Sequence, residues 1–193
     1  MNPRLILASS SKYRRELLSR LVTDFTPVSP EVDESSFHEK SASPEQLAIR
    51  LALEKTRVVF DQYPNAVVIG SDQLVDLDRN ALGKPGTSAA AVAQLMAMSG
   101  KQHRLLTAVC VLSPAGQIEF LNETLLQMRS LSRSEAERYV TLDQPLDCAG
   151  SYRIERRGIA LFESIRTDDF TAIMGLPLIR LSQVLRDLRF AVP

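Results

Sequence analysis

Segments of strand character alternate with segments of helical periodicity along the whole chain, and this alternation is the strongest constraint on the fold. Apolar runs predict three short strands, over residues 4–9, 66–72 and 74–78. Two longer strand segments within residues 104–131 flank the turn sequence SPAGQ and predict an antiparallel hairpin. A last strand is expected over residues 158–165. The chain is therefore expected to form a sheet that combines parallel and antiparallel strands.

Helix signals lie between these strands. Ser43 and Gln46 form a predicted capping box, and Pro44 stands at the first helical position. Ser132 and Glu135 form a second predicted capping box. Further helices are expected over residues 12–21, 89–100 and 175–188. The fold class predicted from these elements is mixed α/β, with a substantial sheet flanked by helices.

Composition limits the domain organisation and the classes of partner. The chain has 193 residues, enough for one sizeable domain over its whole length, and residues 143–153 are too short a linker to separate two. We expect one domain with two lobes and a cleft between them. The net charge of zero favours neither a nucleic-acid nor a membrane partner, although a local basic cluster could still bind a small anion.

The cysteines and the N-terminus bear on the compartment. Cys110 and Cys148 lack metal-ligand spacing and are expected to be reduced thiols. The first apolar run has four residues, too few for a signal peptide or a membrane span. These features predict a cytoplasmic protein.

The familiar phosphate-binding and nucleophile motifs do not occur in the sequence. There is no Walker A loop, no G-x-G-x-x-G after a strand and no G-x-S-x-G, and two histidines are too few for most zinc sites. His103 follows the end of a predicted helix, where orienting the backbone at a strand entrance is favoured over catalysis. Any chemistry must therefore come from other polar groups.

Small polar clusters at strand ends are the remaining candidates. Asp72 follows three apolar residues, and a buried carboxylate requires a hydrogen bond, an ion pair or a metal. The segment LASSSKYRR either binds an anion at a helix start or carries only capping serines; the sequence leaves both interpretations open. Asp33 and Glu34 fit an exposed acidic turn or a second carboxylate site, and Lys55 and Lys84 fit surface residues or phosphate ligands. Convergence of these groups would suit a divalent cation and a polyphosphate.

Seven segments in order carry a family resemblance. LILASSSKYRRELL, EVDE, LALEK, IGSDQ, GKP, SG…H…T and GLPL resemble the signature segments of the Maf family of nucleotide pyrophosphatases, from about Leu5 to about Leu188. The resemblance implies a Maf/ITPase-like fold with an elongated, twisted mixed sheet and two lobes around a central cleft. It also implies hydrolysis of a nucleoside triphosphate to the monophosphate and diphosphate, aided by Mg²⁺ or Mn²⁺.

The resemblance assigns roles to individual residues. Asp72 corresponds to the proton acceptor. We predict that Asp72 and Glu34 together hold the divalent metal. The residues that correspond to substrate-binding positions are Ser9, Arg14, Glu34, Lys55 and Lys84. The implied partner is a small nucleotide, without stable nucleic-acid or membrane binding; a homodimer is compatible with the sequence, which does not fix the oligomeric state.

Three further positions resemble the branch of the family that hydrolyses 7-methyl-GTP. Tyr13 could stack on the cationic N7-methylguanine, and Glu155 could accept hydrogen bonds from guanine N–H groups, with Gln73 as the third selectivity residue. Arg156 and Arg157 adjoin Glu155 and could pair with it. The alternatives are a dTTP/UTP-type pyrophosphatase of the same family, a non-catalytic nucleotide-binding regulator of cell division, and a structural or interaction protein.

Overall fold

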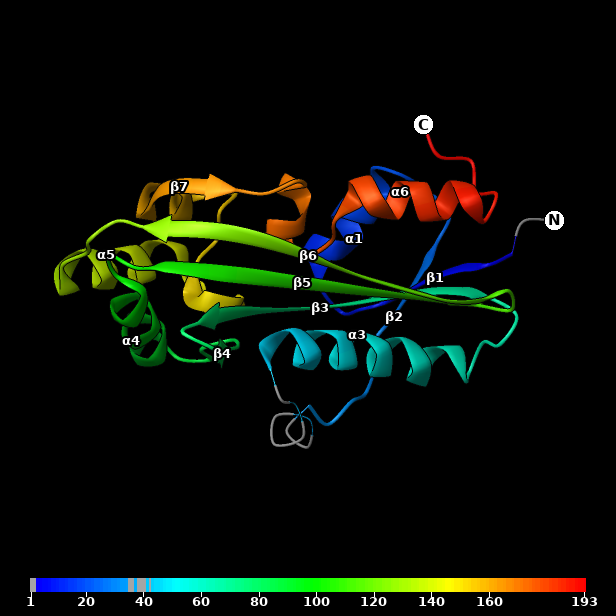
Figure 1. The fold of residues 1–193 in the computed structure, drawn as a ribbon, viewed down its shortest axis with the longest axis horizontal. Helices are drawn as coiled ribbons and strands as arrows, with labels where there is room; N and C mark the ends of the chain where they lie inside the picture. The colour runs from blue at the N-terminus through cyan, green and yellow to red at the C-terminus, as the bar shows by residue number, and fades with distance from the viewer. Residues whose placement is uncertain (1–2, 35–36, 38–40, 42) are drawn as a thin grey trace. The chain divides into compact units, whose positions relative to one another are not determined.

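A computed structural model of the chain describes residues 3–34, 37, 41 and 43–193. Within these residues the strands form a seven-stranded mixed sheet in the order β2-β1-β3-β5-β6-β7, with β4 paired to β3 (Figure 1). The strands are β1 (Leu5–Ala8), β2 (Thr26–Val28), β3 (Val67–Leu77), β4 (Asn80–Leu82), β5 (Gln102–Ser113), β6 (Gly116–Met128) and β7 (Phe162–Arg166). The α-helices are α1 (Lys12–Ser19), α3 (Pro44–Phe60), α4 (Ser88–Met98), α5 (Arg133–Asp143) and α6 (Leu178–Asp187). The predicted mixed α/β class is confirmed.

The chain divides into two compact units, and each is described separately. Unit 1 comprises residues 1–72, 107–122 and 169–193, of which the structure describes the ranges given above. Unit 2 comprises residues 73–106 and 123–168. Strands β3, β5 and β6 contribute residues to both units.

Unit 1 has a three-layer arrangement around parallel strands. Strand β1 pairs in parallel with both β2 and β3, so it is buried on both faces and is apolar at every position. Leu5 and Leu7 pack against side chains of α1 and α6, whereas Ile6 and Ala8 pack against Val59 of α3. Helices α1 and α6 therefore cover one face of the sheet, and α3 covers the other (Figure 1).

The long hairpin appears as predicted. Strands β5 and β6, the two long green strands of Figure 1, are joined by Pro114 and Ala115. In this turn the amide of Ala115 donates to Ser113 Oγ at 3.2 Å. Towards its other end β6 pairs antiparallel with β7, with a register shift between Gln127 and Met128.

Two strand predictions need correction. Residues 66–72 and 74–78 were expected to form separate strands, but β3 is continuous from Val67 to Leu77. The strand predicted over residues 158–165 begins only at Phe162, because residues 157–161 form a short 3₁₀ helix, η2 (Arg157–Leu161). An apolar run of four residues does not distinguish a 3₁₀ turn from a strand. The short strand β4 was not predicted.

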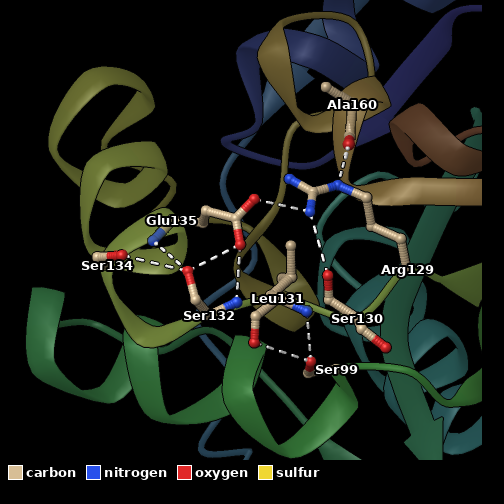
Figure 2. Close-up of polar contacts among 8 residues, drawn as sticks. All are labelled: Ser99, Arg129, Ser130, Leu131, Ser132, Ser134, Glu135 and Ala160. Carbon is tan, nitrogen blue, oxygen red and sulfur yellow. Dashed lines mark hydrogen bonds and ion pairs between the residues drawn. The ribbon is translucent and has the colours of Figure 1, made fainter.

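The helix starts predicted at Ser43 and Ser132 are confirmed, whereas the helix predicted from residue 175 begins only at Leu178, because Gly175 ends the short helix η3 (Phe170–Met174). The start at Ser132 lies in unit 2. Ser132 Oγ accepts from the amide of Glu135, whose carboxylate in turn accepts from the amide of Ser132 at 2.8 Å (Figure 2). Glu135 also pairs with Arg129 at 2.9 Å, and Arg129 Nε donates to the carbonyl of Ala160 (Figure 2). Nearby, Ser99 Oγ accepts from the amide of Leu131. These bonds tie the start of α5 to the end of α4 and to η2.

Candidate active site

Strand β3 determines which way the central polar residues of the site face. Successive side chains of a strand point to opposite faces, and Val68 packs on the α3 side whereas Ile69 packs on the α1 and α6 side. Asp72 is therefore directed to the α3 face and Ser71 to the opposite face. The contacts of both residues agree with this alternation. Lys55 of α3 contacts Asp72, and the carbonyl of Gly175, just before α6, accepts from Ser71.

Lys55 joins two carboxylates at the α3 face. Its Nζ lies 2.5 Å from Asp72 Oδ1 and 2.7 Å from Glu34 Oε1. The side chains of Lys55 and Asp72 are 12% and 9% exposed, whereas Glu34 is 48% exposed. One largely buried ammonium group thus holds a buried and a half-exposed carboxylate together, and the acidic turn that carries Glu34 is part of a polar cluster.

Gly70 explains how Lys55 comes so close to Asp72. A Cβ atom at Gly70 would lie 2.2 Å from Thr56 Oγ1 and 3.1 Å from the carbonyl oxygen of Ala52. The absence of a side chain lets α3 approach β3 directly. Since Lys55 is adjacent to Thr56 on α3 and Asp72 lies two residues beyond Gly70 on the same face, this approach sets the Lys55–Asp72 contact.

Arg14 belongs to the same unit and is oriented by a main-chain carbonyl. Its Nε donates to the carbonyl oxygen of Gly175 at 2.9 Å, and the same oxygen accepts from Ser71 Oγ at 3.0 Å. Burial lowers the pKa of the Arg14 guanidinium, while the charges of Asp72 and Glu34 act in the opposite direction. The guanidinium thus remains within the electrostatic reach of both carboxylates.

The serine segment between β1 and α1 serves first as a cap. Ser11 Oγ accepts from the amide of Arg14, and the buried Ser9 Oγ accepts from the amide of Ser11 at 3.1 Å. These serines therefore bind backbone amides at the start of α1, as the capping interpretation predicted. A serine hydroxyl that accepts one bond can still donate its own proton, so these bonds leave Ser9 able to donate to a phosphate oxygen.

The other predicted residues lie outside the cluster around Lys55. Tyr13 is part of unit 1 and has Lys12 Nζ 5.1 Å from its ring centroid. Gln73, Lys84 and Glu155 belong to unit 2; Gln73 is half-buried in β3, and Lys84 and Glu155 are exposed. Because Gln73 follows Asp72 directly in a strand, the two side chains leave β3 on opposite faces.

Arg157 does not pair with Glu155. Its guanidinium binds Asp143 Oδ1 at 2.9 Å, and its amide donates to Asp143 Oδ2 at 3.0 Å. The carboxylate of Asp143 therefore engages one of the two arginines that were expected to compete for Glu155.

His103 lies in an aromatic cluster of unit 2. Its ring centroid is 5.8 Å from that of Tyr152 and 5.9 Å from that of Phe162, and its Nε2 lies 3.3 Å from the Tyr152 hydroxyl. Burial lowers the pKa of His103 to about 4, so the ring is neutral near pH 7. These contacts give His103 a packing role.

Asp76, Asp143 and Asp169 are buried carboxylates that the sequence analysis did not identify. Asp76 of β3 accepts from Arg104 Nε at 2.9 Å, and Arg104 also pairs with Glu123 at 3.0 Å. The signal that singled out Asp72, a carboxylate inside an apolar run, applied equally to Asp76. Asp169 is 4% exposed and accepts from the amide of Thr171. An aspartate two residues before a threonine is a local turn signal that could have identified it.

The cluster is compatible with a small divalent cation. Glu34 and Asp72 contact one ammonium group, so a single cation could contact both carboxylates in its place. Mg²⁺ is often held by one or two carboxylates together with waters and substrate phosphates. Among the residues that the structure describes, no group of three or more His, Cys, Asp or Glu side chains could hold a metal. The donor set therefore fits a metal that relies on substrate oxygens and competes with Lys55.

Comparison with known proteins places the chain in a family. The family profile described as "Maf-like protein" matches residues 4–188. The chain belongs to the Maf family. The family resemblance predicted from the seven segments is thus confirmed.

Two curated relatives of this Maf protein share one name. A protein of Xanthomonas oryzae pv. oryzae named "7-methyl-GTP pyrophosphatase" is 51% identical over 193 residues, covering 100% of both chains. A protein of Bdellovibrio bacteriovorus with the same name is 47% identical over 183 residues, covering 95% of this chain and 96% of the relative.

Solved structures support the fold alone. The Ham1 protein of Staphylococcus aureus superposes with a TM-score of 0.54 at 11% identity, over 95% of this chain and 98% of that chain. A HAM1 protein of Coxiella burnetii gives the same TM-score at 15% identity, over 96% and 99% of the two chains. The Maf chain therefore shares its architecture with Ham1 proteins despite low sequence identity.

Proposed function

We propose that this Maf protein hydrolyses 7-methyl-GTP to 7-methyl-GMP and diphosphate. The relatives that carry this activity in their names are about half identical to the chain and match it over nearly its full length. The structural observation that supports a hydrolase is the contact of Lys55 with both Asp72 and Glu34. A pure binding protein needs no buried carboxylate next to a phosphate-binding cation, whereas hydrolysis needs a proton acceptor.

In the proposed mechanism Asp72 accepts a proton from the attacking water. Its Oδ1 contacts Lys55, and its second carboxylate oxygen can receive the proton. Arg14, Lys55 and Ser9 bind the triphosphate and stabilise the charge that moves onto the diphosphate leaving group. When bound at Glu34 and Asp72, Mg²⁺ or Mn²⁺ would polarise the phosphoryl group under attack.

The family resemblance extends the proposal to three residues of unit 2. We propose that Lys84 contacts the phosphates, and that Gln73 and Glu155, with Tyr13, select the methylated guanine. A carboxylate accepts from the N1–H and N2–H groups of guanine, which pyrimidines lack. An aromatic ring attracts the cationic base.

We also propose a cytoplasmic role in removing modified nucleotides before they enter nucleic acids. Both cysteines are free thiols, in keeping with a reducing compartment. In the described part of the chain, every helix is too short or too polar to span a bilayer. The substrate is then a free nucleotide, without stable nucleic-acid binding, and the active form a monomer or a homodimer.

Diphosphate release from a nucleotide panel tests the proposal. The purified chain would be assayed with 7-methyl-GTP, GTP, dTTP, UTP and CTP, each with Mg²⁺, with Mn²⁺ and with a chelator. We expect the highest kcat/KM for 7-methyl-GTP, and a loss of activity with the chelator. A preference for dTTP or UTP would instead favour the pyrimidine branch, and binding without hydrolysis would favour a regulator.

A matched pair of variants ties the activity to Asp72. Asp72→Asn should lower kcat by at least about 100-fold, in the range typical for loss of a general base. Asp78→Asn is the control, because Asp78 lies in an exposed turn after β3 and pairs with Lys101 at 3.3 Å. Near-wild-type turnover by Asp72→Asn, in a folded protein, would contradict the assignment.

A further inference from the structure

The carbonyl oxygen of Gly175 is a shared anchor for two segments of unit 1. It accepts from Arg14 Nε of α1 at 2.9 Å and from Ser71 Oγ of β3 at 3.0 Å. A guanidinium bound through Nε keeps four N–H donors on its Nη atoms for other acceptors. The position of this one oxygen therefore determines where the remaining donors of Arg14 point.

Gly175 can present this oxygen because of its backbone conformation. Its φ is +107°, in the left-handed region that favours glycine, and a Cβ there would lie 3.3 Å from Arg14 Nε. Its amide donates to the carbonyl of Ala172 at 2.9 Å, which closes the short helix η3 (Phe170–Met174). The carbonyl thus stands at the turn between η3 and α6.

The side chains of Asp169 and Thr171 form hydrogen bonds with the backbone before and after Gly175, and we call this set of bonds the clasp. Asp169 Oδ1 accepts from the amide of Thr171 at 2.9 Å and lies 2.6 Å from Thr171 Oγ1, and Asp169 Oδ2 accepts from the amide of Ile179 at 2.7 Å. Thr171 Oγ1 lies 3.0 Å from the carbonyl oxygen of Leu176 and accepts from the amide of Leu178 at 2.9 Å. The two side chains are buried, and together they fix the backbone before and after Gly175.

A further bond attaches the clasp to the sheet. Thr107 of β5 donates from Oγ1 to the carbonyl of Ala172 at 3.0 Å. The turn that carries Gly175 is thereby held by Asp169 and Thr171 and, from the sheet, by Thr107. Such a rigid turn can hold a catalytic cation in a constant direction, and a misplacement of about 1 Å costs up to about 100-fold in rate.

We propose that Asp169 is a positioning residue for the reaction, acting through Thr171 and the Gly175 carbonyl on the guanidinium of Arg14. The inference rests on the proposed function, in which Arg14 binds the polyphosphate. Asp169 has a simpler alternative role, because the N-cap residue of α6, Pro177, supplies no side-chain cap, and the first amides of α6 bond to Asp169 and Thr171. The test must separate positioning from helix capping.

A double-mutant cycle with Arg14 makes this separation. Asp169→Asn keeps the shape of the side chain but replaces one acceptor oxygen by a donor, so one amide contact is lost. Arg14→Lys keeps the charge but lacks the Nε donor. We expect Asp169→Asn to lower kcat/KM about tenfold or more in the wild-type background and less than twofold in the Arg14→Lys background. The effect of Asp169→Asn on the free energy of unfolding should be the same in the wild-type and Arg14→Lys backgrounds.

Additional variants test whether Asp169 acts on Arg14 through the hydroxyl group of Thr171. Thr171→Val removes the hydroxyl at nearly constant volume and should resemble Asp169→Asn, whereas Thr171→Ser keeps the hydroxyl and should retain activity within about twofold. Leu181→Ala is the stability control, because Leu181 is a buried side chain of α6 that makes none of the clasp's side-chain bonds. Assayed below its melting temperature, it should keep kcat/KM within about twofold.

The outcomes distinguish this inference from the proposed function. Equal losses of kcat/KM in both backgrounds, or an equal loss in Leu181→Ala, would assign Asp169 to helix capping and overturn the positioning role while leaving the hydrolase intact. If the wild type hydrolyses no nucleotide, the proposed function fails. The double-mutant cycle is then carried out with the affinity for inorganic triphosphate, measured for the wild type, the two single variants and the double variant, in place of kcat/KM. Coupling in that affinity would still support the positioning role; its absence, or a lack of triphosphate binding, would contradict it.

Discussion

Lys55 Nζ lies 2.5 Å from Asp72 Oδ1 in the first of the two compact units, and both side chains are largely buried. The pair joins the longest helix of that unit to the strand that carries the proposed proton acceptor. A buried ion pair of this kind is strongly sensitive to the loss of one partner, because the other charge is then left without compensation.

Removal of the Lys55 charge is expected to affect stability and activity together. Lys55→Met should lower the free energy of unfolding by about 3 kcal/mol, since Asp72 would keep a buried charge without this partner. It should also lower kcat/KM for 7-methyl-GTP, because a phosphate-binding cation is lost. Urea unfolding and diphosphate release measure the two effects.

Two further variants serve as controls for this prediction. Lys101→Met removes an exposed lysine that pairs with Asp78, and it should change stability by less than about 1 kcal/mol. Lys55→Met combined with Asp72→Asn should recover part of the lost stability, because the uncompensated charge is gone. Equal stability of Lys55→Met and Lys101→Met would show that the buried pair is not a stabilising contact.

The close approach of α3 to β3 predicts a steric effect at Gly70. Gly70→Ala places a methyl group 2.2 Å from Thr56 Oγ1, so α3 must shift and carry Lys55 with it. We expect a loss of about 1–3 kcal/mol in unfolding free energy, together with a fall in kcat/KM. Gly83→Ala is the control, since a Cβ there meets no atom within 4 Å. Unchanged melting of Gly70→Ala would contradict the close packing.

The selectivity proposal concerns one residue of unit 1 and two of unit 2. Tyr13→Arg, Gln73→Thr and Glu155→Gln, combined, should shift the ratio of kcat/KM values away from 7-methyl-GTP and towards dTTP and UTP. The cause is the loss of an aromatic face for the cationic base and of a carboxylate for the guanine N–H groups. Arg156→Gln, next to Glu155, is the control and should leave the ratio unchanged. An unaltered ratio in the triple variant would place base recognition on other residues.

His103 predicts a pH dependence of stability. Its pKa is lowered by burial to about 4, against 6.5 in the unfolded chain, so the unfolded chain binds more protons between these values. The contribution of neutral His103 to the free energy of unfolding is complete above pH 6.5 and is lost as the pH falls towards 4. Between pH 7 and 4, His103→Gln should therefore lose less stability than the wild type, by up to about 3 kcal/mol.

Glu135 titrates in a lower range and does not obscure this comparison. Hydrogen bonds from Ser132 and Arg129 hold its pKa at about 2, below its ordinary value of 4.5. The contribution of ionised Glu135 to the free energy of unfolding is therefore complete above pH 4.5 and is lost only as the pH falls below 4.5. Parallel unfolding curves of the wild type and His103→Gln between pH 7 and 4 would contradict the lowered pKa of His103.

The sequence predicted the features that depend on local patterns. Ser43 and Ser132 cap helices as expected, because a side-chain oxygen before an apolar helical pattern is a local signal. The alternation of strands and helices was sufficient for the mixed α/β class. Asp72 was identified because a carboxylate inside an apolar strand must have a partner, and Lys55 supplies it.

Features that depend on tertiary contacts were harder to predict. The continuity of β3 was missed because the polar residues Ser71, Asp72 and Gln73 interrupt the apolar pattern, whereas Ser71 and Asp72 have their partners on opposite faces of the sheet and the strand continues through Gln73. Asp169 was missed because its partners are main-chain amides around a turn. The anchoring of Arg14 by Gly175 joins positions 161 residues apart, which no periodicity connects.

The shared acceptor at position 175 has a consequence for mutational scanning of this enzyme. The oxygen that holds Arg14 and Ser71 belongs to the peptide backbone, so every amino acid encoded at that codon would still carry it. A scan of position 175 would consequently record tolerance for a left-handed turn and say little about the hydrogen bonds themselves. Information about the acceptor would appear instead at codons 169 and 171, whose side chains decide where that oxygen lies.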